Sequence, residues 1–101
     1  MVTAPMRAKK DLCVIAYDIA DNKRRNRIIK IIEPYGRRVN YSVFECMFTP
    51  AQFEKVLLRL EKVVVKGEDS IAIYPLCVNC YARTILIPPR KNEFRTVTVF
   101  D

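Results

Sequence analysis

The centre of the fold is predicted to be a strand with the sequence Leu12-Cys13-Val14-Ile15-Ala16-Tyr17-Asp18-Ile19. Such a short apolar run, closed by the turn-forming and capping residues Ala20-Asp21-Asn22, is typical of a buried central strand rather than a helix. Its single acid, Asp18, lies where the strand leaves the core. A carboxylate at that point needs a hydrogen-bond donor, a cation or a metal. Asp18 is therefore either held by backbone amides or an arginine, or it has a functional role.

The basic residues that follow this strand indicate a polyanionic partner. The chain has 101 residues and a formal net charge of +7. Between positions 23 and 38 there are seven Lys or Arg residues and one acid, Glu33. Several of them occupy the first turns of a predicted helix, the end at which the helix dipole disfavours cations. A nearby phosphate explains this placement better than a solvated helix face does.

Residue types that the chain lacks exclude several kinds of site. There is no histidine, which removes histidine general bases, Ser-His-Asp and Cys-His catalysis, and histidine-liganded zinc. The two glycines, Gly36 and Gly67, are too far apart for a phosphate-cradling loop. No segment approaches the roughly 18 apolar residues of a membrane span, and the first ten residues lack an apolar signal segment. We therefore expect a cytoplasmic protein that does not contact a membrane.

The order of the predicted elements is β-α-β-β-α-β with further strand segments after it. They cover residues 12–19 (strand), 22–35 (helix), 37–48 (extended, with a turn near 40–42), 50–65 (helix), 71–76, 84–87 and 94–100 (strands). The second helix has the clearest signal, because Thr49-Pro50-Ala51-Gln52 is a capping box with proline in the first turn. This order predicts an α+β, ferredoxin-like fold with an extra C-terminal strand, in which both helices cover one sheet face and the other face is open for dimerisation.

Three parts are predicted along the chain. They are a basic N-terminal arm (residues 1–10), a ferredoxin-like domain (11–88), and a linker with a C-terminal strand (89–101). Pro88 and Pro89 prevent ladder pairing in the linker. A strand placed after such a linker is suited to pairing with the sheet edge of another subunit, so we expect a homodimer.

Asp18 alone gives too few ligands for a metal-dependent phosphodiesterase in a monomer. A two-fold axis changes this count, because it brings the same residue from both subunits together. Mg²⁺ tolerates so sparse a site, since it keeps several waters and needs only one or two carboxylates. A bound water would serve as nucleophile while the metal polarises the phosphate. We therefore expect one Mg²⁺ shared by two Asp18 side chains at the dimer axis.

Four cysteines leave more than one interpretation open. Cys77 and Cys80 form a CxxC motif, which with Cys13 and Cys46 is compatible with a four-thiolate zinc site. Cys13 and Cys46, however, fall inside apolar strands, where cysteine behaves as a small hydrophobic residue. A single CxxC is a weak signal, so the pair is open to a metal role, a redox role or neither.

Three motifs resemble those of the CRISPR-associated protein two family, the small subunit of the spacer-acquisition machinery. They are Tyr17-Asp18-Ile19, the segment Asp21-Asn22-Lys23-Arg24-Arg25-Asn26-Arg27, and Arg38-Val39-Asn40-Tyr41-Ser42-Val43-Phe44-Glu45. The motifs occur in the order and spacing of the family, and the resemblance covers residues 12–99. Asn40 departs from the family pattern, in which glutamine is frequent.

The resemblance implies a homodimeric, metal-dependent endonuclease that acts on RNA or double-stranded DNA. It implies that Asp18 binds Mg²⁺ and that Tyr17, Ser42 and Phe44 support the catalytic cleft. Arg25, Arg27 and Arg38 are implied to contact phosphates, and with their neighbours Arg24 and Arg37 they form the predicted nucleic-acid-binding set. Phe44 also has an ordinary interpretation as a core aromatic, and Tyr17 as a packing residue.

Family members also join a CRISPR integrase and hold captured DNA. This implies a CRISPR integrase subunit as a partner and gives an alternative function, a non-catalytic DNA-binding scaffold that bridges integrase dimers. A third hypothesis is a toxin-like or small-ligand regulatory module of the same fold.

Overall fold

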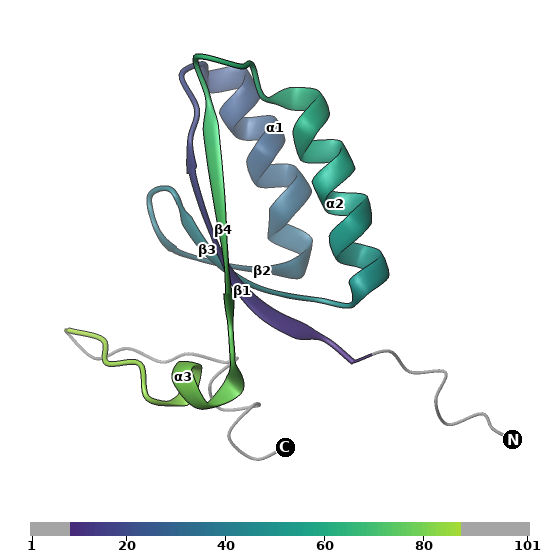
Figure 1. The fold of residues 1–101 in the computed structure, drawn as a ribbon. Helices are drawn as coiled ribbons and strands as arrows, with labels where there is room; N and C mark the ends of the chain where they lie inside the picture. The colour runs from purple at the N-terminus through teal and green to yellow at the C-terminus, as the bar shows by residue number, and fades with distance from the viewer. Residues whose placement is uncertain (1–8, 88–101) are drawn as a thin grey trace, which may run out of the picture.

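The computed structural model describes residues 9–87. Its elements are β1 (Asp11–Asp18), α1 (Asn22–Ile32), the 3₁₀-helix η2 (Glu33–Tyr35), β2 (Gly36–Asn40), β3 (Val43–Phe48), α2 (Pro50–Val63), β4 (Ser70–Leu76) and α3 (Val78–Ala82). The strands form one antiparallel sheet in the order β2-β3-β1-β4, and α1 and α2 lie side by side on one of its faces (Figure 1). The predicted ferredoxin-like α+β fold is confirmed.

β1 lies between β3 and β4, as its apolar run predicts. Ile15 pairs with Phe44 on β3 and with Ile73 on β4. Because side chains alternate along a strand, Cys13, Ile15 and Tyr17 enter the core beneath the helices. The intervening residues of β1, Asp18 among them, belong to the opposite side of the sheet, which we call the open face.

The two long helices begin where the capping signals place them. The Asp21 side chain caps α1 by accepting from the Arg24 backbone N–H at 3.0 Å. The capping box of α2 is complete, because Thr49 and Gln52 each accept from the other's backbone N–H. Helix α1 ends earlier than predicted, at Ile32, and gives way to the 3₁₀-helix that contains Pro34. Proline has no backbone N–H and therefore cannot continue the α-helical hydrogen bonding.

Gly36 connects η2 to β2 at a point of very close packing. A Cβ atom there would lie 2.1 Å from the Glu45 carbonyl oxygen and 2.7 Å from the Cys46 sulfur. The backbone of Gly36 is extended, so close packing against β3, rather than an unusual φ angle, requires glycine here.

The segment after β4 differs from the sequence-based prediction. Residues 78–82, for which the sequence predicts no helix or strand, form the short helix α3, and Tyr81 from this helix is 1% exposed. Its hydroxyl donates to Glu45 Oε1 at 3.1 Å, so α3 covers one end of the open face. Residues 84–87 were predicted to be a strand, and this is wrong: no strand of residues 9–87 pairs with them, and Ile85 and Ile87 are 80% and 90% exposed.

Several predictions lie outside the described residues. The first eight residues of the basic arm, the prolines of the linker and the C-terminal strand at 94–100 are among them, so the division into three parts stays a prediction. Within residues 9–87, no helix has the length and apolar character needed to cross a membrane.

Candidate functional site

A shallow depression of about 240 Å³ lies where the end of β1 meets the β2–β3 turn and the start of β4. It is lined by Ala16, Tyr17, Asp18, Ser42, Val43, Ser70, Ile71 and Ala72. The antiparallel register explains this gathering, because it places Ala16 opposite Val43 and Asp18 opposite Ser70. The depression therefore contains three of the four residues predicted to be catalytic: Tyr17, Asp18 and Ser42.

Asp18 offers its carboxylate without an internal partner. It is the last residue of β1 and is exposed, and no hydrogen bond or ion pair joins its side chain to any part of residues 9–87. Over the same residues there is no group of three or more His, Cys, Asp or Glu side chains that would hold a metal ion. Among the residues that the structure describes, Asp18 is thus the one carboxylate that lines this depression.

Tyr17 positions the turn that carries Ser42. Its side chain is buried, and its hydroxyl donates to the Tyr41 carbonyl oxygen at 3.0 Å. Its backbone N–H donates to the Ser42 carbonyl oxygen, also at 3.0 Å. Both hydrogen bonds fix the β2–β3 turn against the end of β1, so Tyr17 acts on the depression through its neighbours.

Phe44 is separated from the depression by the sheet. Its side chain is 2% exposed and packs in the core, with its ring centroid 6.2 Å from that of Tyr17. Phe44 faces the helices, whereas Asp18 belongs to the open face. The position of Phe44 therefore does not support the predicted contribution of its side chain to the cleft. The ordinary interpretation of Phe44 as a core aromatic fits the geometry.

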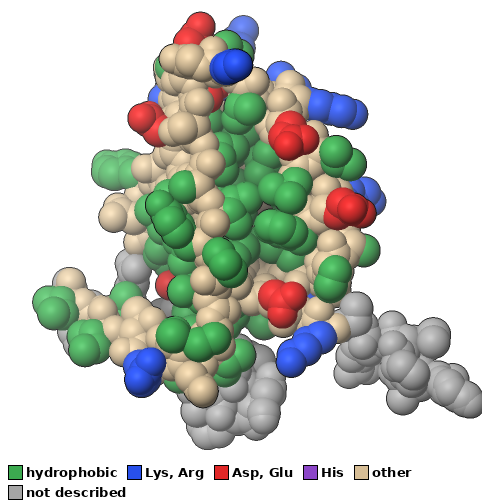
Figure 2. Space-filling view, viewed as in Figure 1, with side chains coloured by type: hydrophobic (Ala, Val, Ile, Leu, Met, Phe, Trp, Pro, Cys, Tyr) green, Lys and Arg blue, Asp and Glu red, His purple; other side chains and the backbone are tan. Residues whose placement is uncertain are grey.

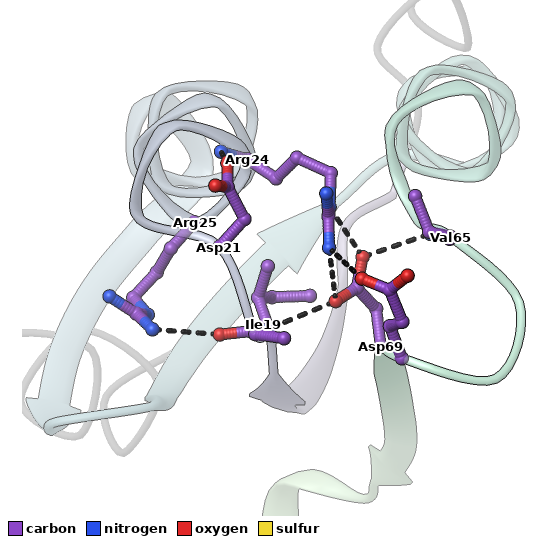
Figure 3. Close-up of polar contacts among 8 residues, drawn as sticks. Ile19, Asp21, Arg24, Arg25, Val65 and Asp69 are labelled. Atoms are coloured by element: carbon purple, nitrogen blue, oxygen red, sulfur yellow. Dashed lines mark hydrogen bonds and ion pairs between the residues drawn. The ribbon is translucent and has the colours of Figure 1, made fainter.

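The five predicted arginines do not form one patch. The guanidinium of Arg24 is occupied by two acids, Asp69 through Nε at 2.8 Å and Glu68 through Nη2 at 3.0 Å (Figure 3). Asp69 also accepts from the backbone N–H groups of Ala20 and Val65, both at 2.9 Å. Arg24 lowers the pKa of Asp69 well below its usual range, and Asp69 in turn raises the pKa of Arg24. Arg24 therefore stabilises the fold.

Arg25 turns back onto the segment that follows β1. Its Nη2 donates to the Ile19 carbonyl oxygen at 2.8 Å (Figure 3). Its Nη1 donates to the Asn22 side chain. This position braces the connection between β1 and α1, and Arg25 is half-buried.

The remaining three arginines lie in different places. Arg27 is exposed on α1, on the side that faces α2. Arg37 pairs with Glu45 in the β2–β3 ladder and so belongs to the open face; its Nη1 is buried without a hydrogen-bond partner in the described residues. Arg38 lies on the other face, with its guanidinium carbon 5.8 Å from the Phe44 ring centroid.

Comparison with known proteins places this arrangement in a family. The family model described as CRISPR associated protein Cas2 matches residues 11–84. This chain belongs to the Cas2 family. The resemblance noted in the sequence is thus confirmed, and the match extends from β1 to just beyond α3.

One protein related by sequence and two solved structures illustrate the similarity to Cas2 proteins. A protein of Synechocystis sp. named CRISPR-associated endoribonuclease Cas2 3 is 48% identical over 65 residues, which are 64% of this chain and 71% of that protein. The crystal structure of Streptococcus pyogenes Cas2 at pH 6.5 superposes with a TM-score of 0.69 at 35% identity, covering 74% of this chain and 96% of that one. A chain from a partial Cas6-RT-Cas1–Cas2 complex superposes with a TM-score of 0.68 at 26% identity, covering 77% and 91%.

Sequence reasoning missed two residues beside the Cas2 site. Asp69 has no predicted role, although it anchors Arg24 and the backbone after β1. Once β4 is placed antiparallel to β1, the residue before β4 must lie beside the residue after β1, and this signal would have found it. Tyr41 belongs to the third motif but has no predicted role; it is 88% exposed at the turn next to Ser42.

The four cysteines of this Cas2-family chain do not form one cluster. Cys13 and Cys46 face each other across β1 and β3 and are buried in the core, as small hydrophobic residues are expected to be. Cys77 and Cys80 are exposed at the start of α3, and all four thiols are free. A four-thiolate zinc site within one chain is therefore excluded by the positions of these residues.

Proposed function

We propose that this chain is a CRISPR-associated endonuclease that hydrolyses phosphodiester bonds of RNA or double-stranded DNA at a site shared by two copies. The proposal rests mainly on the depression that gathers Asp18 and Ser42 at the end of β1. The Synechocystis relative is named an endoribonuclease, and this supports assigning nuclease activity here.

The open face is the proposed homodimer surface. It carries apolar side chains that are half-buried or exposed within one chain, namely Val14, Ala16, Val43, Met47, Ala72 and Tyr74. The buried Nη1 of Arg37, which lacks a hydrogen-bond partner in residues 9–87, belongs to the same face. Buried donors are nearly always satisfied, so the Arg37 guanidinium would have to turn toward a second copy on this face for Nη1 to gain a hydrogen-bond partner.

A divalent cation fits this site only when two copies contribute. Asp18 is a hard oxygen ligand of the kind that Mg²⁺ prefers, but residues 9–87 of one copy bring a single carboxylate to the depression. Two Asp18 side chains facing each other across a two-fold axis would hold one ion, which would supply an activated water and charge neutralisation when bound. Within each chain, Tyr17 keeps the Ser42 turn in place, and Ser42 adds a hydroxyl to the depression.

Tyr41 is the proposed base contact of the site. Its exposed ring lies at the turn that borders the depression, and exposed aromatic rings stack on unpaired bases of single-stranded nucleic acid. The net charge of +7 favours a polyanion at this surface.

The alternative function is a DNA-binding scaffold for the CRISPR integrase. One observation favours it: among residues 9–87, no hydrogen bond orients the Asp18 carboxylate, whereas catalytic groups are usually held in place by their surroundings. The fold neighbour from the partial Cas6-RT-Cas1–Cas2 complex supports an integrase subunit as a partner. Both functions place the protein in the cytoplasm.

The deciding experiment compares Asp18→Asn with the matched control Glu54→Gln, which changes an exposed carboxylate on α2. Purified protein is assayed on RNA and on double-stranded DNA with Mg²⁺ and with EDTA. We expect Asp18→Asn and EDTA each to lower the cleavage rate about a hundredfold or more, with dimerisation and affinity near wild type. Full activity of Asp18→Asn would exclude the nuclease site. Spacer acquisition that survives Asp18→Asn but fails without residues 94–100 would favour the scaffold.

A further inference from the structure

A second hollow lies on the helical side of the molecule, between α1 and α2. Its volume is about 410 Å³, and it is lined by Arg27, Lys30, Ile31, Arg59, Lys62 and Val63. Each helix contributes two cations and one buried apolar residue, and no acid lines the hollow. We call these four cations and the space between them the basic groove.

Residue spacing explains why the cations converge. On each helix the two cations are three residues apart, so they lie on the same side of the helix. The helices lie next to each other and run in opposite directions (Figure 1), and residues from the second half of α1 line the groove together with residues from the second half of α2. Lys23 and Lys55 stand four residues before Arg27 and Arg59 and continue the two rows.

The acids of α2 lie on a different side of that helix. Glu61 lines the hollow between α2 and β4, where Figure 2 shows acidic side chains bordering an apolar surface. Within residues 9–87, both ion pairs use Arg24, and none uses a cation of the basic groove. Like charges held close together destabilise a helix pair, so an anion in the groove would relieve their repulsion.

The chemistry of the groove favours nucleic acid over a protein partner. Protein interfaces have an apolar core, whereas the two apolar residues that line this groove, Ile31 and Val63, are already buried. Rows of exposed Lys and Arg without an apolar anchor are typical of sequence-independent contacts to phosphates. We propose that the basic groove is a second nucleic-acid surface, which holds the sugar-phosphate backbone away from the site of cleavage.

The position of the basic groove determines its role in binding. The sheet lies between the basic groove and the open face that carries Asp18, so a backbone bound in the groove does not enter the depression (Figure 1). The groove therefore adds affinity for long nucleic acid without cutting it. This inference rests on the proposed function only in requiring a nucleic-acid ligand.

The test compares two double variants that remove the same charge. Arg59→Gln/Lys62→Gln changes the groove, and Lys9→Gln/Lys10→Gln changes two exposed lysines outside it. Binding of a labelled duplex is measured by fluorescence anisotropy in EDTA over a range of KCl concentrations. We expect the groove variant to bind about tenfold more weakly near 0.1 M salt and to reduce the salt slope by about 2, and the control to change both much less.

The outcomes separate this inference from the proposed function. If the wild-type protein binds no nucleic acid, both the basic groove and the proposed function are excluded. If wild type binds and the two variants lose equal affinity, or the groove variant loses none, the basic groove is excluded and the Asp18 site stands. Arg59→Glu/Lys62→Glu should weaken binding further than the glutamine variant, and unchanged thermal melts show that each variant is folded.

Discussion

Arg24 and Asp69 lie 45 residues apart in the sequence, and the Nε of Arg24 donates to Asp69 Oδ2 at 2.8 Å. The same carboxylate accepts from the backbone N–H of Ala20, just after β1, and of Val65, just after α2. One side chain therefore joins two connections at the end of the sheet that carries Asp18 (Figure 3).

Asp69→Asn is expected to destabilise the protein in a pH-dependent way. Because the folded-state pKa of Asp69 lies below its ordinary value of 3.8, the carboxylate stabilises the fold fully above about pH 4, and the stabilisation is lost as the pH falls further. At pH 7 the variant should melt roughly 5–10 °C below wild type, and this gap should narrow below about pH 4. Melts followed by circular dichroism between pH 7 and pH 2 measure it. A difference in melting temperature that stays constant from pH 7 to pH 2 would contradict this role of the Asp69 carboxylate.

Gly36→Ala is expected to cost more stability than Gly67→Ala. At Gly36 the new methyl group would overlap the Glu45 carbonyl oxygen, and overpacking of this kind costs about 3 kcal/mol. Gly67 has open space around it but a φ of +89°, so alanine there introduces backbone strain of about 1 kcal/mol. Urea unfolding of both variants gives the two free energies. The reverse ranking would show that β2 shifts to accommodate the side chain.

Tyr41→Ala is expected to weaken binding of single-stranded RNA. Loss of one stacked base costs about 1–3 kcal/mol, or roughly fivefold to a hundredfold in affinity, whereas Tyr41→Phe keeps the ring and should bind like wild type. Titration of a labelled oligonucleotide in EDTA measures both. The Tyr41 carbonyl that accepts from Tyr17 is backbone and is present in both variants, so the turn is retained. Equal affinity of the alanine variant and wild type would remove Tyr41 from the site.

Cys77 is expected to react fastest among the four thiols. A hydrogen bond from the Cys80 side chain, aided by the Cys80 backbone N–H, lowers the pKa of the Cys77 thiol, while the contact with Cys13 and burial raise that of Cys46. More thiolate at neutral pH means faster alkylation. Mass spectrometry after brief iodoacetamide treatment should find Cys77 modified first and the two core cysteines protected until urea is added. Cys80→Ala should move the pH midpoint of Cys77 alkylation upward.

The sequence predicts the elements of the fold well because their signals are local. The capping box at Thr49 and the apolar run of β1 each specify an element within a few residues. Residues 84–87 show the limit of this reasoning, because a strand also needs a neighbour and the described part of the chain provides none.

The site was predicted only in part for a related reason. Asp18, Ser42 and Tyr17 meet because strand register follows from the order of the elements. Arginine side chains are long, and their partners come from distant segments of the chain. The five arginines that are clustered in the sequence therefore make separate contacts in the structure. The partner of Arg24 is found only after β4 is placed beside β1.

The hydrogen bond from Tyr81 to Glu45 fixes α3 and its CxxC pair to one end of the sheet, and Asp18 lies at the other. β4 connects these two ends through seven residues, a span of roughly 20 Å. We therefore expect substitutions near one end of the sheet to leave the other end intact. A descendant of this chain that loses the carboxylate at position 18 would therefore keep its architecture, and one that remodels α3 would keep the depression at Asp18.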